Sequence, residues 1–139
     1  MIRPALLSDI PAIRALMESE PGFWQPNWSE KTIATAIVSA NGLAFVWEED
    51  FRILGFVCAH DLGFRGYLSE LIVSWEARNQ GVGDALVRRV EEGLDQRQQA
   101  TVIADVWRDA VPFYESLGWE RPEAVLLRQK LPYTGNTRR

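Results

Sequence analysis

The residues best suited to chemistry lie where a predicted strand ends and a helix begins. Leu71-Ile72-Val73 closes an apolar run, and Arg78, Gly81 and Gly83 follow at the entrance of a helix. The first N–H groups of a helix have no partner within it and carry roughly half a positive charge. Glycine lets the backbone approach a ligand closely, and Arg78 adds a full charge. The pattern therefore predicts a site for an anion such as a pyrophosphate.

Three phosphate-binding motifs compete for this stretch, and one of them fits. The ATPase loop G-x-x-x-x-G-K-[ST] needs a lysine, and none follows Gly83. The dinucleotide pattern G-x-G-x-x-G/A meets Leu86 at its last position, and its loop is too long. The pattern [R/Q]-x-x-G-x-[G/A] is met by Arg78, Gly81 and Gly83. It is the pyrophosphate loop of acetyl-CoA-dependent N-acetyltransferases, and the chain resembles that GNAT superfamily.

A second stretch strengthens the resemblance. Residues 110–119, AVPFYESLGW, are similar to the family signature A-x-x-x-Y-x-x-x-G-[FW], in which a short helix presents a tyrosine. The opening Ile2–Ala5 and the helix start at Ser8–Ile10 are also similar to the family's beginning. The resemblance spans about residues 1–130 in the family's order and spacing. Together these stretches indicate an N-acetyltransferase.

The resemblance implies acetyl-CoA as co-substrate, lying in a gap between two diverging strands, with no metal. The main chain of Leu71, Ile72 and Val73 would hold the pantetheine arm, and one of their N–H groups would polarise the thioester carbonyl. Trp107 stands where many members have an asparagine that contacts CoA, and we expect it to pack on the cofactor instead. The pyrophosphate would be gripped by the loop residues Arg78, Asn79, Gln80, Gly81, Val82 and Gly83.

Tyr114 is the first candidate catalytic residue, and the resemblance gives it the role of general acid toward the departing thiolate. Its reference pKa of about 10 lies above the ~8.5 of a thiol, so it would hydrogen-bond to the thiolate but protonate it only weakly. The alternative for Tyr114 is packing of the short helix.

Glu70 is the candidate general base, because some family members use a glutamate on this strand. Alternation predicts Leu68, Glu70 and Ile72 on one face, where a carboxylate among apolar neighbours is costly unless it is used or paired. Two alternatives stay open. Glu70 would form a salt bridge with Arg65 or Arg52, or the reaction would proceed without a dedicated base.

The acceptor is expected to be a primary amine of a small molecule or peptide, attacking directly in a ternary complex. The resemblance places its site in residues 18–28, the hairpin and the chain beyond Gly118. The alternative for the aromatic residues there is capping of the two early helices. The aromatic wall would come from Phe23, Trp24 and Trp28, and the negative charge from Glu18, Glu20 or Asp61.

Two other functions compete with this interpretation. A non-catalytic acyl-CoA-binding or interaction module would keep the same fold. A hydrolase would use Cys58 as nucleophile and His60 as base, since residues i and i+2 share one face of a strand. A small buried thiol is the favoured interpretation of Cys58, because reactive cysteines need an electropositive setting.

The elements that position these residues alternate between strands and helices. Helical spacing is found around residues 10–17, 30–40, 83–94 and 110–117. The predicted fold class is α/β (α+β): one domain over residues 1–131 and a polar tail over 132–139. We expect a mixed, mostly antiparallel sheet of about six to seven strands, with helices on both faces and two strands splayed for the cofactor. Strands are predicted at Ile2–Leu7, Leu43–Trp47, Arg52–His60, Tyr67–Val73, Ala100–Val106 and Ala124–Leu131.

Composition narrows the possible partners, metal sites and location of the protein. The length of 139 residues suits a single domain, and a net charge of −4 argues against nucleic acid or an anionic membrane as partner. A single cysteine and a single histidine exclude an internal disulfide and a four-ligand Cys/His zinc site. No apolar run reaches the length of a spanning helix, so we predict a cytoplasmic protein. Many members of the family form pairs, which leaves a homodimer open.

Overall fold

The structure, a computed structural model, describes residues 1–132. The chain divides into two compact units, residues 1–104 and 105–139, and each is described by itself. Of the predicted polar tail, residues 132–139, all but Pro132 lie outside the described residues.

One five-stranded sheet forms the centre of the first unit, and its strands lie side by side in chain order. The pairs β1–β2, β2–β3 and β3–β4 are antiparallel, whereas β4 and β5 are parallel. A mixed, mostly antiparallel sheet is therefore confirmed. The strands are β1 (Ile2–Pro4), β2 (Ala44–Glu49), β3 (Arg52–Asp61), β4 (Gly66–Val73) and β5 (Val102–Ile103).

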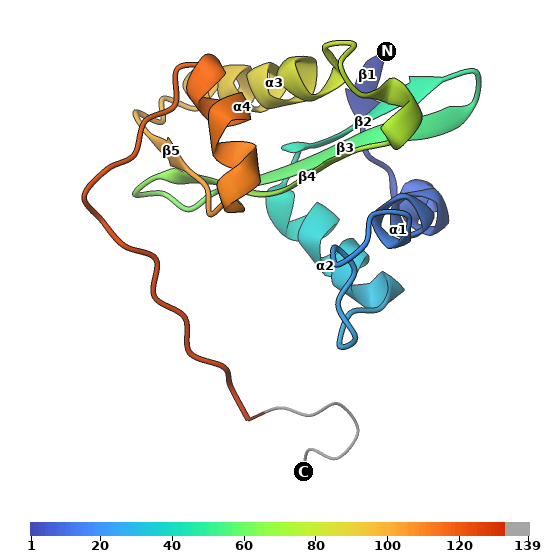
Figure 1. Ribbon diagram of the computed structural model, residues 1–139, viewed down its shortest axis with the longest axis horizontal. Helices are drawn as coiled ribbons and strands as arrows, with labels where there is room; N and C mark the ends of the chain where they lie inside the picture. Colours follow the sequence, from blue (N-terminus) through green and yellow to red (C-terminus); the bar gives the residue numbers. More distant parts are fainter. Residues whose placement is uncertain (133–139) are drawn as a thin grey trace. The chain divides into compact units, whose positions relative to one another are not determined.

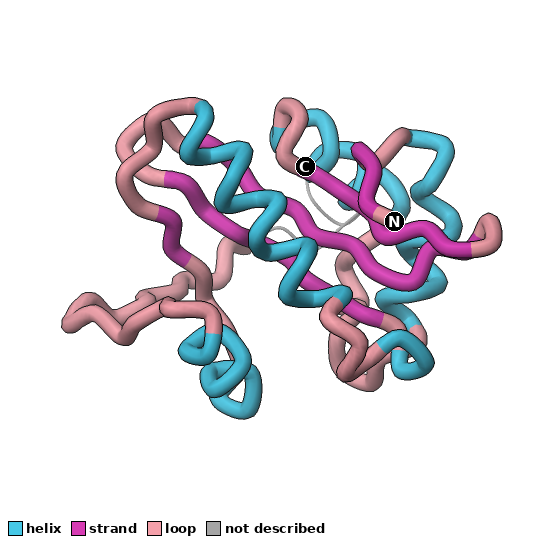
Figure 2. The backbone as a smooth tube through the Cα atoms, turned by 90° about the horizontal axis from the view of Figure 1, so that it is seen from above, coloured by secondary structure: helices cyan, strands magenta, loops and turns pink. Residues whose placement is uncertain are grey.

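Helices cover both faces of this sheet, as predicted (Figure 1). α1 (Ile10–Glu18) and α2 (Glu30–Ala40) contact β3 from one side. α3 (Val82–Gln96) lies on the other side, where it contacts β2, β3 and β4 and runs at a small angle to the central strands (Figure 2). Short 3-10 turns precede α1 at Leu7–Asp9 and follow β4 at Trp75–Ala77. The apolar residues of α3 buried against the sheet are Val82, Leu86, Val87, Val90 and Leu94.

Glycine allows α3 to lie very close to the sheet. A Cβ atom at Gly66 would lie 2.7 Å from Cδ1 of Leu94, and one at Gly55 would lie 2.9 Å from Cδ1 of Leu86. Real Cβ atoms do not come this close to buried carbon atoms, so any larger residue would push the helix or its leucines away. The α3 side of the sheet is thus a tight, apolar interface.

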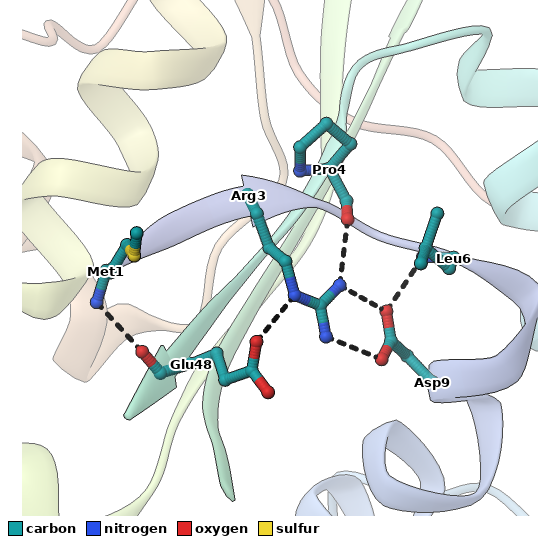
Figure 3. A network of polar contacts seen from close by, with 6 residues as sticks. All are labelled: Met1, Arg3, Pro4, Leu6, Asp9 and Glu48. Carbon is teal, nitrogen blue, oxygen red and sulfur yellow. Dashed lines mark hydrogen bonds and ion pairs between the residues drawn. The ribbon is translucent and has the colours of Figure 1, made fainter. Parts of the chain in front are cut away.

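A polar network joins β1 to the beginning of α1 (Figure 3). The Arg3 guanidinium donates to both carboxylate oxygens of Asp9 at 2.8 Å and to Glu48 in β2 at 2.7 Å. The backbone N–H of Leu6 donates to Asp9 at 2.8 Å. These donors lower the pKa of Asp9, with the hydrogen bonds from Arg3 as the largest cause.

The predicted number of strands was too high. Among the described residues no strand forms at Ala124–Leu131, so the sheet has five strands rather than six to seven. The sequence of this segment gives the physical reason. Val125, Leu126 and Leu127 are followed by three polar residues, so neither face of an extended strand there would be uniformly apolar. These three apolar side chains are exposed.

The predicted strand Ala100–Val106 was also too long. Only Val102 and Ile103 pair with β4, opposite Gly66 and Tyr67. A run of apolar residues becomes a strand only as far as it finds a backbone partner. The parallel pairing therefore ends after two residues.

The second unit holds a short helix, α4 (Val111–Ser116), preceded by a 3-10 turn at Arg108–Ala110. Tyr114 is buried and packs edge-on against Phe113 and Trp119, with ring centroids 5.0 and 5.2 Å away. Gly118, at a φ of 95°, ends the helix, as glycine does at a left-handed position.

Candidate functional site

The first feature of the site is an open edge along β4. Beyond Tyr67 this strand continues through Val73, and no further pairing with β5 follows among the described residues. Ser74 donates its N–H to the carbonyl of Leu54 in β3 at 2.8 Å. Backbone N–H and C=O groups alternate in direction along a strand. Those of Ile72 therefore also point toward β3, while those of Leu71 and Val73 point to the open edge. This edge offers the N–H and C=O groups of Leu71 and the N–H of Val73 to an extended ligand, while the Val73 carbonyl accepts a hydrogen bond from Arg78.

The second feature is the loop at which β4 leads into α3. Gly81 has a φ of 80° and is the cap residue of α3. The N–H of Ala85 makes the first α-helical hydrogen bond, to the carbonyl of Gly81 at 3.0 Å. The N–H groups of Val82, Gly83 and Asp84 precede that bond and therefore have no acceptor within the helix. The loop thus presents backbone donors at the positive end of a four-turn helix, which suits an anionic group.

Arg78, the one fixed cation of this loop, already has partners in the structure. Its Nε donates to the carbonyl of Val73 at 3.1 Å, and its Nη2 lies 2.5 Å from a carboxylate oxygen of Glu20. The guanidinium also lies 4.1 Å from the ring centre of Trp75. Arg78 therefore joins the end of β4 and the segment after α1 to the loop.

A β-bulge is the third feature, and it corrects the predicted alternation. Cys58 of β3 faces Glu70, but the next residue, Ala59, faces Leu68, so Ser69 is an extra residue in β4. Neighbouring residues of β3 point to opposite faces, so Leu68 and Glu70 lie on opposite faces too. Leu68 lies on the α3 side, whereas Glu70 and Ile72 lie on the α1/α2 side. The prediction that all three share one face was wrong.

The bulge gathers polar residues on the α1/α2 side of β3 and β4. His60 contacts Ser69 Oγ through Nε2 at 3.1 Å and Ser39 Oγ of α2 through Nδ1 at 3.2 Å. Its ring stacks on Tyr67, with centroids 6.4 Å apart. We call Cys58, His60, Tyr67, Ser69 and Glu70 the bulge cluster. The cluster brings titratable side chains of β3 and β4 together, and its β4 members lie on the strand that has the open edge.

Cys58 is completely buried within this cluster. Burial raises the pKa of its thiol to about 12. A nucleophilic cysteine must reach its thiolate form near neutral pH, and this environment strongly disfavours that form. The hydrolase hypothesis for Cys58 and His60 is therefore contradicted.

A comparison with known families now bears on this arrangement. The acetyltransferase (GNAT) domain family matches residues 17–135, which is most of the chain. The chain belongs to the GNAT acetyltransferases. The resemblance seen in the sequence is thereby confirmed.

Individual relatives agree with this family. The chain is 30% identical over 128 residues to peptidyl-lysine N-acetyltransferase YiaC of Escherichia coli, covering 86% of this chain and 82% of the relative. Among solved structures, the ribosomal-protein-S18-alanine N-acetyltransferase of Escherichia coli has a TM-score of 0.72 at 27% identity, over 85% of this chain and 76% of the other. The PaiA N-acetyltransferase of Thermoplasma acidophilum, solved with coenzyme A, has a TM-score of 0.77 at 15% identity. That alignment covers 90% of this chain and 92% of the PaiA chain, and it shows the shared fold.

The GNAT residues predicted from the sequence fall into two groups. Glu70, Leu71, Ile72 and Val73 lie together on β4, and residues 78–83 follow directly as the loop. Tyr114 and Trp107 belong to the second unit, where Tyr114 is buried and Trp107 is 79% exposed. Their roles remain predictions.

The predicted acceptor region is built largely by packing. Phe23 and Trp24 each meet Trp28 edge-on, with centroids 6.3 and 5.5 Å apart, and Arg14 lies over Trp24. These three rings are half-buried, and their part in an acceptor site stays a prediction. Asp61 accepts from the N–H of Gly63 at 2.9 Å and from Gln99 at 2.6 Å, so it serves the β3–β4 turn.

One predicted alternative for Glu70 loses its basis. Arg52 engages both carboxylate oxygens of Glu76. It also lies six residues along β3 from Cys58, the partner of Glu70, which is about 20 Å of strand. A salt bridge between Arg52 and Glu70 is thereby excluded by distance.

Two features of the site had no sequence signal. The bulge at Ser69 inserts one residue into an ordinary-looking apolar strand, and nothing in its composition marks it. The pairing of Glu20 with Arg78 joins residues 58 positions apart. Only the packing of α1 beside the end of β4 brings them together.

Two absences hold for residues 1–132. No three side chains of the metal-binding types His, Cys, Asp and Glu lie close enough to hold a metal ion there. Over the same residues no helix is both long and apolar enough to cross a membrane.

Proposed function

We propose that this protein transfers the acetyl group of acetyl-CoA to a primary amine of a peptide or protein. The observation that carries the proposal is the open edge of β4 running directly into the anion loop of α3. The acceptor class is supported by the names of two relatives, which act on peptidyl lysine and on the alanine of ribosomal protein S18. A small-molecule amine is the alternative acceptor.

The described residues fit acetyl-CoA. The N–H and C=O of Leu71 and the N–H of Val73 point outward, where an extended pantetheine arm would pair with them. The Val73 carbonyl accepts from Arg78, and the backbone groups of Ile72 are directed to β3. The N–H groups of Val82, Gly83 and Asp84 would receive the diphosphate, together with the backbone of Asn79, Gln80 and Gly81. Acetyl-CoA supplies the activated acyl group as a thioester.

Glu70 is proposed as the group that takes the proton from the amine. A primary amine with a pKa near 10 is mostly protonated at neutral pH, and removing its proton costs about 4 kcal/mol. The bulge moves Glu70 to the α1/α2 face and places it one residue before Leu71, whose N–H faces the open edge. A carboxylate there, held on a rigid strand, is positioned to accept that proton.

Tyr114 is proposed to donate a hydrogen bond to the departing thiolate, and Trp107 to pack on the cofactor. The role of Tyr114 is supported by the match of residues 110–119 to the GNAT signature, whereas Trp107 replaces the family's asparagine and its role rests on its position alone. Tyr114 is held firmly by its two aromatic neighbours, which suits a residue that must keep one orientation.

A peptide panel tests the function directly. Purified protein is incubated with acetyl-CoA and three peptides: one with a free N-terminus and no lysine, one with a blocked N-terminus and a lysine, and one with both amines blocked. Release of CoA with either of the first two peptides, and none with the third, is expected. Binding of CoA without release on any peptide or small amine would favour the alternative, a non-catalytic acyl-CoA-binding module.

A glycine substitution tests the loop assignment. Gly81→Asp should weaken CoA binding severely, because it places a carboxylate where the diphosphate is proposed to lie. Gly63→Asp is the matched control, since Gly63 also has a positive φ (83°) and open space around it, but lies in the β3–β4 turn. Near-normal CoA affinity of Gly81→Asp, or equal losses in both variants, would remove the loop from the cofactor site.

A further inference from the structure

Arg78 is neutralised before any cofactor is bound. It is the only cationic side chain in residues 78–83, and Glu20 lies 2.5 Å from its Nη2. Both side chains of this pair are about one-third exposed, so water and a ligand can reach them. Glu20 belongs to neither the loop nor β4, and it follows the end of α1.

We infer that Glu20 weakens cofactor binding by competing with the diphosphate for Arg78. This inference rests on the proposed function, since it assumes that the loop receives the diphosphate of CoA. A diphosphate is recognised best by an unpaired, planar guanidinium, which offers two parallel donors. In the free protein Glu20 holds one such donor, and its negative charge also repels an arriving anion.

The remaining contacts of Arg78 show why the competition is confined to Glu20. The Nε donor is directed to the Val73 carbonyl, and the flat face is covered by Trp75. Both contacts fix the guanidinium at the loop, and neither brings a negative charge to it. The Glu20 contact alone must be given up, or shared, when the diphosphate arrives.

The competition has a consequence for turnover. Acetyl-CoA and the product CoA carry the same diphosphate, so Glu20 weakens both to the same extent. A carboxylate that re-forms its pair with Arg78 thereby assists release of the product. Glu20 is thus a positioning residue for the cofactor site that acts through Arg78.

A double-mutant cycle on CoA affinity, measured by calorimetry, tests the inference. Glu20→Gln is expected to bind CoA about two- to fivefold tighter, the range for releasing a partly exposed ion pair. Arg78→Gln should bind more weakly than the parent protein. In the Arg78→Gln background, Glu20→Gln should bring no further gain, because its partner is gone. Glu92→Gln is the matched control, since Glu92 pairs with Arg89 on the exposed side of α3 and should leave CoA affinity unchanged.

Kinetics add a readout that a merely structural role would not move. Glu20→Gln should lower the KM for acetyl-CoA without raising kcat, and Glu20→Asp, one methylene shorter, should fall between the parent and Glu20→Gln. Unchanged or weaker CoA binding by Glu20→Gln, or an equal gain in the Arg78→Gln background, would overturn the inference. Failure of the parent protein to bind CoA at all would instead overturn the proposed function.

Discussion

The two faces of the sheet at β3 and β4 differ sharply in what they hold. The α3 face is apolar and so tight that Gly55 and Gly66 leave no room for a Cβ atom. The α1/α2 face carries the bulge cluster, with its histidine, serine, tyrosine and carboxylate. We call the α3 side the packing face and the α1/α2 side, which holds the proposed base Glu70, the chemical face.

The bulge creates this separation. If Ser69 were paired in regular alternation and formed no bulge, Glu70 would lie on the same face as Leu68, beneath α3. A carboxylate in that apolar interface would be costly to bury. By inserting one residue, β4 keeps Leu68 on the packing face and brings Glu70 to the face that α3 does not cover.

The largest expected effect belongs to the chemical face. Glu70→Gln should lower kcat/KM for acetyl transfer about 100- to 10,000-fold, the range for losing a positioned base. CoA affinity and the free energy of unfolding should stay close to those of the parent protein. Steady-state kinetics and urea unfolding check both halves of this statement.

A matched change on α3 completes that test. Glu92→Gln removes a carboxylate of the same kind from the exposed side of α3 and should leave the rate unchanged. A normal rate in Glu70→Gln would return Glu70 to a structural role and leave the reaction without a dedicated base, one of the alternatives raised by the sequence.

The packing face should respond in the opposite way. Leu86 of α3 is fully buried against Gly55 of β3. Leu86→Ala should therefore lower the free energy of unfolding by about 2–5 kcal/mol. The rate per folded molecule should be retained, because no group of the bulge cluster is touched. Val38→Ala, at an exposed position of α2, should change stability by less than about 0.5 kcal/mol. A small loss in Leu86→Ala would show that the α3 interface is looser than its geometry indicates.

Much of this contrast, but not its cause, is predictable from the sequence. Apolar spacing identified α3 and the antiparallel strands, because periodicity reports burial. The anion loop was predictable because Arg78, Gly81 and Gly83 are adjacent in the chain. The face of the sheet on which Glu70 lies was not predictable, since a bulge depends on how β3 and β4 pair. The pairing of Arg78 with Glu20 was not predictable from the sequence either, because the segment after α1 reaches the loop only through tertiary packing. The segment 124–131 was assigned a strand on its apolar content, although a strand also requires a backbone partner.

A smaller effect is expected where α1 begins on the chemical face. Asp9→Asn should destabilise the protein by about 1.5–3 kcal/mol at neutral pH, the cost of losing hydrogen bonds to a charged group. The pKa of Asp9 is lowered in the folded state, so its stabilisation is complete above its unfolded pKa of about 4 and is lost as the pH falls through the lower folded value. The gap between parent and variant should therefore shrink toward zero in acid, as urea unfolding at several pH values would show. Asp84→Asn, which breaks an exposed helical pair with Arg88, should cost at most about 0.5 kcal/mol at any of these pH values.

The smallest effect at neutral pH belongs to Cys58, the buried member of the bulge cluster. Cys58→Ala should keep its acetyltransferase rate, and the parent thiol should react with iodoacetamide only after unfolding. Because the folded pKa is raised to about 12, the folded protein holds the thiol proton that the unfolded chain loses above about pH 8.5. Stability of the parent should therefore fall with rising pH by up to about 1.4 kcal/mol per pH unit in this range, and Cys58→Ala should lack that slope. Equal slopes in the two proteins would mean that the thiol ionises as easily inside the cluster as in water. Water would then have access to the space between α2 and the sheet.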